Sequence, residues 1–228
     1  MNKEYNSTYF RKTLFLKTFY NKLLLFYREK IHLIFMENIN YNLDKSLLDI
    51  GTTPSLNDMH NVILTKTQDN NNITCLSDQD CNILKSKFTN VKNFLKVDGK
   101  NTNLKNESFD IVYSNAVIEH VGSFENQIKF IRECVRLSKS EVFITTPNRF
   151  FPFDFHTKIP LLHMLPKSLH RKILKFIGLG FYANEKNLNL LSKSEIVKIC
   201  DIIQLKNYRI LELKITLLTS NLILIIRK

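Results

Sequence analysis

Glycine is scarce in this chain, with only five in 228 residues, and no stretch gathers several of them as a phosphate-binding loop would. The four cysteines form no C-x-x-C pair, so the sequence indicates neither a zinc-binding motif nor a disulfide framework. No apolar run approaches the roughly 18 residues of a membrane span, and the N-terminus lacks the apolar core and cleavage site of a signal peptide. These absences predict a cytoplasmic protein with buried free thiols and no bound metal.

The net charge of +12 is concentrated in two segments. Residues 1–30 carry seven basic and two acidic side chains, and residues 158–175 carry five basic and no acidic ones. Residues 31–157, by contrast, hold slightly more acids than bases. Two interpretations stay open: the basic segments contact an anionic surface at the inner face of the membrane, or they are solvated faces without a partner.

The first segment has the pattern of an amphipathic helix. Phe15, Phe19, Leu23 and Phe26 recur at helical spacing, and charged side chains occupy another face. This spacing predicts a helix of about 25 residues. We expect it to lie in a basic N-terminal extension that covers residues 1–43.

From residue 46 onward, short apolar runs alternate with helical patterns. This alternation predicts a parallel sheet with helices on both faces. The expected strands lie at 46–50, 71–76, 93–97, 109–114 and 141–146, and the expected helices lie within 56–67, 79–88 and 124–137.

The C-terminal part has a different order. Ser192 and Glu195 form a capping-box pattern that opens a helix over 193–203. Two β-rich runs, 208–218 and 221–228, then follow with only two residues between them, which allows only an antiparallel hairpin. The sequence therefore predicts an α/β fold: a Rossmann-like, doubly wound, mostly parallel seven-stranded sheet that ends in an antiparallel hairpin.

Polar residues follow each of the expected parallel strands. In open parallel sheets a ligand lies beyond the carboxyl ends of the strands, so we expect these residues to meet around one site. They are Asp49 and Gly51 after the first strand, Ser77 and Asp78 after the second, Asp98 and Gly99 after the third, Ser114 and Asn115 after the fourth, and Thr146 and Asn148 after the fifth.

This arrangement resembles the class I S-adenosylmethionine-dependent methyltransferases over about residues 44–228. The most specific match is “SFDIVYSNAVIEHV”, with “VDG” upstream of it and “FITTPN” downstream. The resemblance implies S-adenosylmethionine as the cofactor and methyl transfer as the activity. The first-strand motif of that family, D/E-x-G-x-G-x-G, is “DIGTTPS” here. We interpret it as a working variant, because S-adenosylmethionine has no phosphate that the later glycines would have to accommodate.

The resemblance also assigns the strand ends to parts of the cofactor. The implied positions are Asp49 and Gly51 along the methionine part, Asp78 at the ribose hydroxyls, Asp98 and Gly99 at the adenine ring, and Asn115 and Ala116 along the site after the fourth strand. Asp98 would accept a hydrogen bond from the adenine amino group.

A hydroxyl or amine acceptor usually also needs a base, and the ordinary pKa of histidine suits that task. His120 follows the fourth strand, and His156 lies in the aromatic stretch “FFPFDFH”. Both are candidate catalytic residues. Two alternatives stay open: His120 only hydrogen-bonds the scaffold, and His156 is a loop histidine without a role.

The segment 158–191 is expected to form an insertion on the acceptor side of the domain. Lys167, Arg171 and Lys175 recur at four-residue spacing on one face of a helix that Pro166 opens, and this face is either solvated or contacts an anionic membrane or a phosphate-linked acceptor. The stretch “TPNRFFPFDFHTKIPLLHMLP” resembles a methyltransferase subgroup found near surface-polysaccharide and glycan genes. That resemblance implies a small-molecule acceptor or one linked to a glycan or lipid.

Other classes of function were compared with this hypothesis. A non-catalytic binding module that uses the same fold is the main alternative. A nicotinamide-dependent oxidoreductase is disfavoured because “GTTPS” lacks the glycines that a pyrophosphate needs. Nucleic-acid methylation is disfavoured because the chain has no N/D-P-P-Y/F block, and its basic residues do not interleave with aromatic ones around the expected site.

Overall fold

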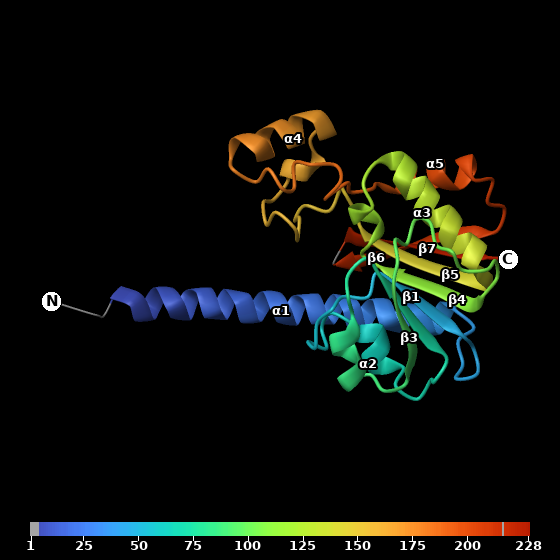
Figure 1. The fold of residues 1–228 in the computed structure, drawn as a ribbon. Coiled ribbons are helices and arrows are strands. Elements are labelled where there is room, and N and C mark those ends of the chain that lie inside the picture. Colours follow the sequence, from blue (N-terminus) through green and yellow to red (C-terminus); the bar gives the residue numbers. More distant parts are fainter. Residues whose placement is uncertain (1–4, 216) are drawn as a thin grey trace.

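A seven-stranded sheet forms the centre of the protein, in a computed structural model that describes residues 5–215 and 217–228, with side chains from Lys22 onward. The strand order is β3-β2-β1-β4-β5-β7-β6, and every pairing is parallel except those that β7 makes with β5 and β6. The predicted fold class is therefore confirmed (Figure 1). The strands are β1 (Leu47–Ile50), β2 (Ile73–Ser77), β3 (Val91–Lys96), β4 (Phe109–Asn115), β5 (Ser138–Pro147), β6 (Tyr208–Ile215) and β7 (Leu218–Arg227).

Helices cover both faces of the sheet. One face packs against α3 and α5, and the other packs against α1 and the short segments α2 and η1, so the central strands are buried on both sides. The helical elements are α1 (Tyr5–Asn38), α2 (Val62–Lys66), η1 (Asn82–Ser86), η2 (Ile118–His120), α3 (Phe124–Leu137), η3 (Leu162–Met164), α4 (Lys167–Phe176) and α5 (Lys193–Ile202), where η marks a 3₁₀ turn.

The N-terminal helix α1 is longer and more deeply packed than the sequence predicted. It has 34 residues, and from Tyr27 on every fourth side chain is buried: Tyr27, Ile31 and Phe35 in the helix, and Ile39 directly after it. The buried positions continue the four-residue spacing of Phe15, Phe19 and Leu23, but Phe26 lies off this stripe and is 50% exposed. The side chains of Phe15 and Phe19 lie outside the described residues. Ile31, Phe35 and Ile39 belong to one buried cluster with residues of the sheet.

The helix expected within 56–67 is present but short, and the helix expected over 79–88 is a 3₁₀ turn. The first is the five-residue α2, and the second is η1. The Asn61 side chain explains the first difference, since it bonds the backbone of Thr53 and Ser55 and holds residues 53–61 as a loop. The predicted capping box is present: the Ser192 hydroxyl accepts from the Glu195 N–H, and the Glu195 carboxylate accepts from the Ser192 N–H.

The C-terminal hairpin turns three residues earlier than predicted. β6 ends at Ile215 and β7 begins at Leu218, so Thr219 and Ser220 belong to β7 and do not form the turn. Both hydroxyls reach across to β6, where Thr219 bonds Glu212 and Ser220 bonds the carbonyl of Leu213. The register shifts at this point, which is how the pair of strands accommodates the extra residue.

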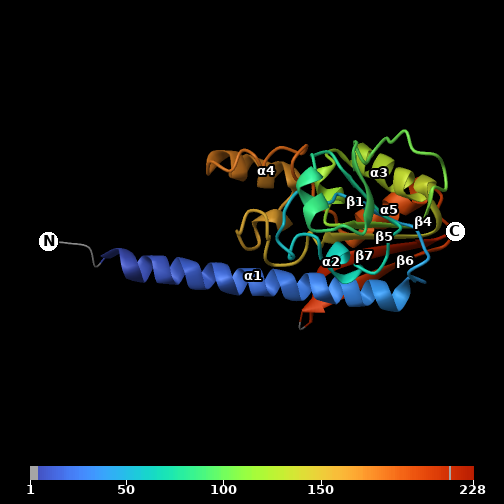
Figure 2. The same ribbon diagram turned by 60° about the horizontal axis from the view of Figure 1, so that its bottom comes forward.

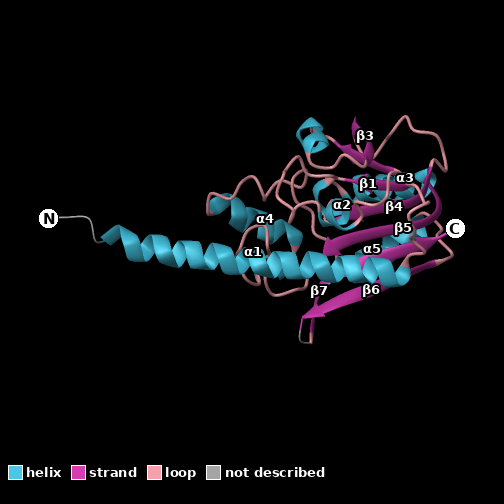
Figure 3. Cartoon of the chain, turned by 90° about the horizontal axis from the view of Figure 1, so that it is seen from below, coloured by secondary structure: helices cyan, strands magenta, loops and turns pink. Residues whose placement is uncertain are grey.

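Two segments extend from the sheet on the side where its parallel strands end. The N-terminal half of α1 projects past the sheet. The segment between β5 and α5 (residues 148–192), which carries α4 and is called the insertion from here on, projects in the same direction (Figures 2 and 3). The carboxyl ends of the parallel strands lie between them. No helix in the described part of the chain is both long and apolar enough to cross a membrane.

The contact of α1 with the sheet gives a prediction about stability. Phe35 is fully buried, with its ring centroid 5.4 Å from that of Tyr113 and 5.3 Å from that of Phe143. Phe35→Ala should lower the free energy of unfolding by about 3–5 kcal/mol, whereas the control Phe26→Ala on the same helix should cost about 1 kcal/mol or less. Urea denaturation measures both. Equal small losses would show that α1 is a dispensable extension.

Candidate functional site

A cavity of about 380 Å³ opens at the carboxyl ends of β1, β2 and β4. Side chains from four strand ends meet there, as expected from the parallel sheet. Of the nine residues predicted to bind the cofactor or to act in catalysis, six line it: Gly51, Asp78, Asp98, Gly99, Ala116 and His120. Asp49 and Asn115 line a smaller cavity beside it, and His156 contacts His120.

Gly51 lets the chain turn sharply at the end of β1. Its φ angle is +94°, in the region that favours glycine, and its N–H donates to the carbonyl of Leu76 at 2.7 Å. A Cβ at this position would collide with the side chain of Val117. The glycine is therefore required by the protein itself, in addition to any ligand that passes close to it.

The far side of the cavity carries two acids. Asp78 is exposed at its rim, and Asp98 forms an ion pair with Lys100, with 2.9 Å between the carboxylate and the ammonium. Partial burial opposes ionisation of Asp98, but the hydrogen bonds from Lys100 outweigh it and lower the pKa of the carboxyl group. Gly99 is needed for packing, because a Cβ there would lie only 2.8 Å from Ile50. Both acids are thus available as acceptors for hydroxyl or amino groups.

The smaller cavity, of about 80 Å³, shares Gly51, Thr53 and Ala116 with the large one. Asp49 lines it and is 5% exposed. Burial raises the pKa of Asp49 to about 6, although the Thr52 hydroxyl, at 2.6 Å, opposes this by donating to the carboxylate. A carboxylate that is so poorly solvated favours a cationic ligand.

Arg28 of α1 also lines the smaller cavity, where its guanidinium donates to the carbonyl of Met59. Sequence analysis missed this residue, because the helix that carries it was expected to be an extension of the domain. No pattern in the sequence marked it, because the position of Arg28 at the cavity follows from the burial of its neighbour Tyr27, which only the structure shows.

The turn after β4 places the next functional group. Ala116 has a φ angle of +55°, which is unusual for a residue with a side chain, and its N–H donates to the carbonyl of Thr145 at 3.1 Å. The Asn115 side chain accepts from the Thr145 hydroxyl at 2.5 Å. These bonds to β5 hold the turn, which leads directly into η2 and presents Glu119 and His120.

His120 and His156 meet although 36 positions separate them in the sequence. Their ring centroids are 5.0 Å apart, and one ligand atom each from Glu119, His120 and His156 lies within 4.8 Å of the others. The Asp154 carboxylate lies 3.0 Å from Nδ1 of His156. Burial alone would lower the pKa of His156, but the hydrogen bond to Asp154 and the charge of Glu119 raise it. Glu119 was not among the predicted site residues.

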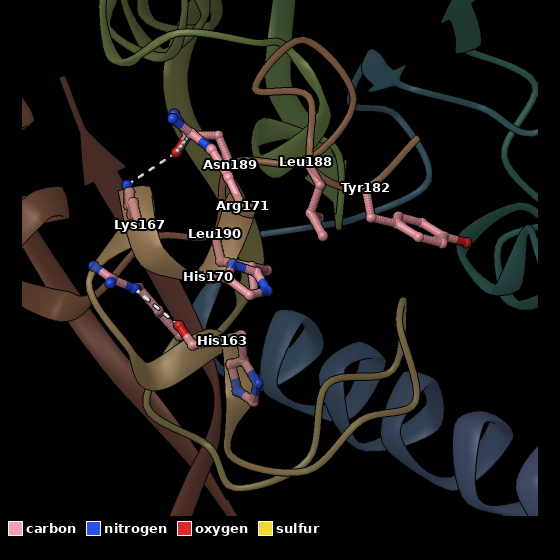
Figure 4. Close-up of a pocket in the computed structure, with 9 residues that line it drawn as sticks. His163, Lys167, His170, Arg171, Tyr182, Leu188, Asn189 and Leu190 are labelled. Carbon is pink, nitrogen blue, oxygen red and sulfur yellow. Dashed lines mark hydrogen bonds between the residues drawn. The ribbon is translucent and has the colours of Figure 1, made fainter. Parts of the chain in front are cut away.

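The basic face of α4 has a different environment from the one expected. Lys167 donates to Asn189 at 2.9 Å and pairs with Glu195 at 2.7 Å, and Arg171 pairs with Glu185 at 3.1 Å. These contacts surround a small cavity of about 20 Å³ between α4 and the chain that follows it (Figure 4). Two of the three predicted basic residues therefore hold α4 against the domain, and Lys175 is the exposed one.

Comparisons with known proteins bear on the fold and on the type of domain. Residues 62–145 match the family model of a methyltransferase domain. No curated protein matches the chain.

Solved structures with the same fold include two described as S-adenosylmethionine-dependent methyltransferases. The one from Archaeoglobus fulgidus has 14% identity and a TM-score of 0.55, over 88% of this chain and 94% of that protein. The one from Aquifex aeolicus has 13% identity and a TM-score of 0.56, over 90% and 92%. A third, described as a putative Zn-dependent alcohol dehydrogenase from Rhodobacter sphaeroides, has 13% identity and a TM-score of 0.55, over 86% and 88%. At these identities the likeness establishes the fold.

Burial of Asp49 predicts a dependence of stability on pH. Its folded-state pKa of about 6 lies above the ordinary value, so the folded protein holds the proton more tightly and loses stability as the pH rises from about 4 to about 6. Asp49→Asn removes the ionisation and keeps an oxygen for Thr52. At about pH 7.5 the ligand-free variant should be more stable than wild type by about 2–3 kcal/mol, a gain that vanishes near pH 4. Urea denaturation at several pH values tests this, and parallel pH profiles would contradict it.

Proposed function

We propose that this chain is a class I S-adenosylmethionine-dependent methyltransferase and that it methylates a hydroxyl or amino group of a small-molecule acceptor or of one linked to a glycan or lipid. The observation that carries the proposal is the convergence of the polar strand ends on one cavity, with the pair of histidines at the side where the insertion lies. The match to a methyltransferase domain supports the cofactor and the reaction.

The cofactor occupies both cavities in this proposal. Adenine and ribose lie in the large cavity, where Asp98 accepts from the adenine amino group and Asp78 from the ribose hydroxyls. The methionine part passes Gly51 into the small cavity, where Asp49 accepts from its ammonium group and Arg28 binds its carboxylate. The ammonium group of the ligand thus lies beside a carboxylate, and its carboxylate lies beside a guanidinium. The ammonium group also places a positive charge next to the buried Asp49.

The reaction itself requires little from the protein beyond orientation. A lone pair of the acceptor attacks the methyl carbon, the bond from that carbon to sulfur breaks, and its electron pair stays on sulfur to give S-adenosylhomocysteine. The acceptor's proton passes to His120 or His156, which lie beside the cavity. Holding the acceptor in line with the methyl group supplies roughly 7–11 kcal/mol of the rate enhancement.

The insertion supplies the acceptor side. Phe151 and Phe155 stack in parallel at 6.3 Å between centroids, and Phe153, which is 36% exposed, meets Phe155 edge to face. His156 follows this group directly. A partly exposed aromatic group beside side chains that accept hydrogen bonds suits an acceptor that has both an apolar face and hydroxyl groups, such as a sugar. A non-catalytic module with the same fold would need the cofactor cavity, but it would not need the histidine pair.

Isothermal calorimetry tests the cofactor and its orientation together. S-adenosylhomocysteine should bind much more tightly than NAD. Arg28→Met should weaken S-adenosylhomocysteine by about 10–100-fold and leave methylthioadenosine, which lacks the amino-acid part, nearly unaffected. Lys206→Met, an exposed position before β6, is the control.

Two outcomes would contradict these proposals separately. Binding of NAD as tightly as S-adenosylhomocysteine would contradict the proposed methyltransferase activity. Equal weakening of both adenosine ligands by Arg28→Met would show that Arg28 acts through the fold and not through the ligand's carboxylate.

The proposal extends to location: a cytoplasmic enzyme that contacts the anionic inner face of the membrane peripherally. The support comes from the end of α4, where Phe176 is 91% exposed and Phe181 66% exposed, next to the exposed Lys172 and Lys175. Apolar rings flanked by lysines are typical of interfacial contact. The N-terminal half of α1, whose sequence is basic, extends from the same side of the domain.

Vesicle co-sedimentation tests this contact. Wild-type protein should sediment with vesicles that contain phosphatidylserine, and less so as the salt concentration rises. Phe176→Ser combined with Phe181→Ser should reduce the bound fraction several-fold, whereas Ile83→Ser, which removes an apolar side chain that is 53% exposed on η1, should not. If wild-type protein stays in the supernatant at low salt, the membrane contact is wrong and the basic segments are solvated faces without a partner.

A further inference from the structure

Glu119, His120 and His156 form a cluster of ligand-type side chains at the rim of the cofactor cavity. His120 lines the cavity, Glu119 precedes it in η2, and His156 comes from the insertion. One ligand atom from each lies within 4.8 Å of the other two. Within the part of the chain that the structure describes, this is the group of three such residues that is close enough to share one ion.

Both histidines are oriented through the same ring nitrogen. Nδ1 of His120 lies 2.7 Å from the carbonyl of Asn187, and Nδ1 of His156 lies 3.0 Å from the Asp154 carboxylate. Carbonyl and carboxylate oxygens only accept, so each Nδ1 carries the proton in these bonds. In the neutral ring, Nε2 then keeps its lone pair. A histidine fixed in this way by a carbonyl or carboxylate is the usual arrangement of a metal ligand.

Only one of the two carboxylate oxygens of Glu119 has a hydrogen-bond partner among the described residues. The side chain is fully buried, and its Oε2 accepts from the Thr146 hydroxyl at 3.0 Å. Its Oε1 is buried as well and has no hydrogen-bond partner among the described residues. A buried carboxylate oxygen without a partner is costly, and a nearby cation removes that cost.

We propose that Glu119, His120 and His156 bind one divalent first-row transition-metal ion, with Zn²⁺ the best fit. Two imidazoles and one carboxylate suit such ions, whereas Mg²⁺ and Ca²⁺ prefer oxygen ligands throughout. Zinc bonds of about 2.0–2.2 Å place neighbouring tetrahedral ligand atoms about 3.5 Å apart. The ligand atoms, which spread to 4.8 Å, therefore close by about 1 Å around the ion.

The position of the ion has a consequence for catalysis, and this part rests on the proposed function. Three protein ligands leave one coordination position of the ion open. Because His120 lines the large cavity, this open position lies at the rim of that cavity, near the expected methyl group. An acceptor hydroxyl in that position is oriented toward the methyl group, and its pKa falls because the ion withdraws electron density from the oxygen. In the ion-loaded enzyme the histidines are then ligands and do not act as bases.

Titration of the chelator-treated full-length protein with Zn²⁺, followed by calorimetry, tests the site. Wild type should bind one ion, and Co²⁺ in its place should give a visible absorption spectrum. Glu119→Gln, His120→Ala and His156→Leu should each weaken Zn²⁺ by at least about 100-fold. Asp154 is not one of the three ligands but orients His156 through Nδ1, so Asp154→Ala, which removes this acceptor, should weaken binding by about 10–100-fold.

Controls separate this site from other causes. His32→Gln on α1 removes a histidine outside the cluster and should leave Zn²⁺ binding unchanged. Circular dichroism of the metal-free variants checks folding; His156→Leu, in a loop, tests the site if Glu119→Gln does not fold. A wild-type protein without a saturable site, or a folded His156→Leu variant that binds Zn²⁺ as tightly as wild type, would overturn the proposal. S-adenosylhomocysteine binding by metal-free protein reports on the proposed function independently of the ion.

Discussion

The central strands of this sheet carry apolar side chains on both faces, so both faces have to be covered, and α1 covers one of them. Its stripe of buried side chains includes Phe35, which packs edge to face against the stacked rings of Tyr113 of β4 and Phe143 of β5. This contact fixes the position of the helix. Arg28, which lies about two turns before Phe35, therefore reaches the small cavity. The small cavity thus depends on the packing of α1, and Tyr113 takes part in both, because it contacts Phe35 and lines the cavity.

The sheet and the strand ends could be predicted because they follow from local rules. Alternating apolar runs give the strands, and the carboxyl ends of parallel strands share one edge, so Gly51, Asp78 and Asp98 line one cavity as expected. The packing of α1 could not be predicted, since a helix with apolar residues on several sides has no single obvious buried stripe. The position of the hairpin turn was missed because hydroxyls suit both a turn and, as at Thr219, a bond across to β6.

The histidine cluster shows where local rules fail for a physical reason. His156 reaches His120 only because the insertion folds back over the strand ends, a contact between segments that no spacing in the sequence encodes. Ala116 adopts a backbone conformation that its side chain disfavours, and Glu119 buries an oxygen that lacks a partner. Departures of this kind persist where the surroundings enforce them, and they gather around functional groups. Here they lie within four residues of each other, directly after β4.

The contact between α1 and the last strands also constrains how the protein is made. The Asn38 side chain accepts from Arg209 at 2.8 Å and its carbonyl from Arg227 at 3.0 Å, and the face that α1 covers includes Ile223 and Ile225 of β7. During translation α1 leaves the ribosome long before β7 exists, so its apolar stripe has no complete partner until nearly the whole chain has been synthesised. Contacts of such long sequence separation slow folding. The newly made helix is therefore exposed to chaperones and to aggregation for most of the synthesis time.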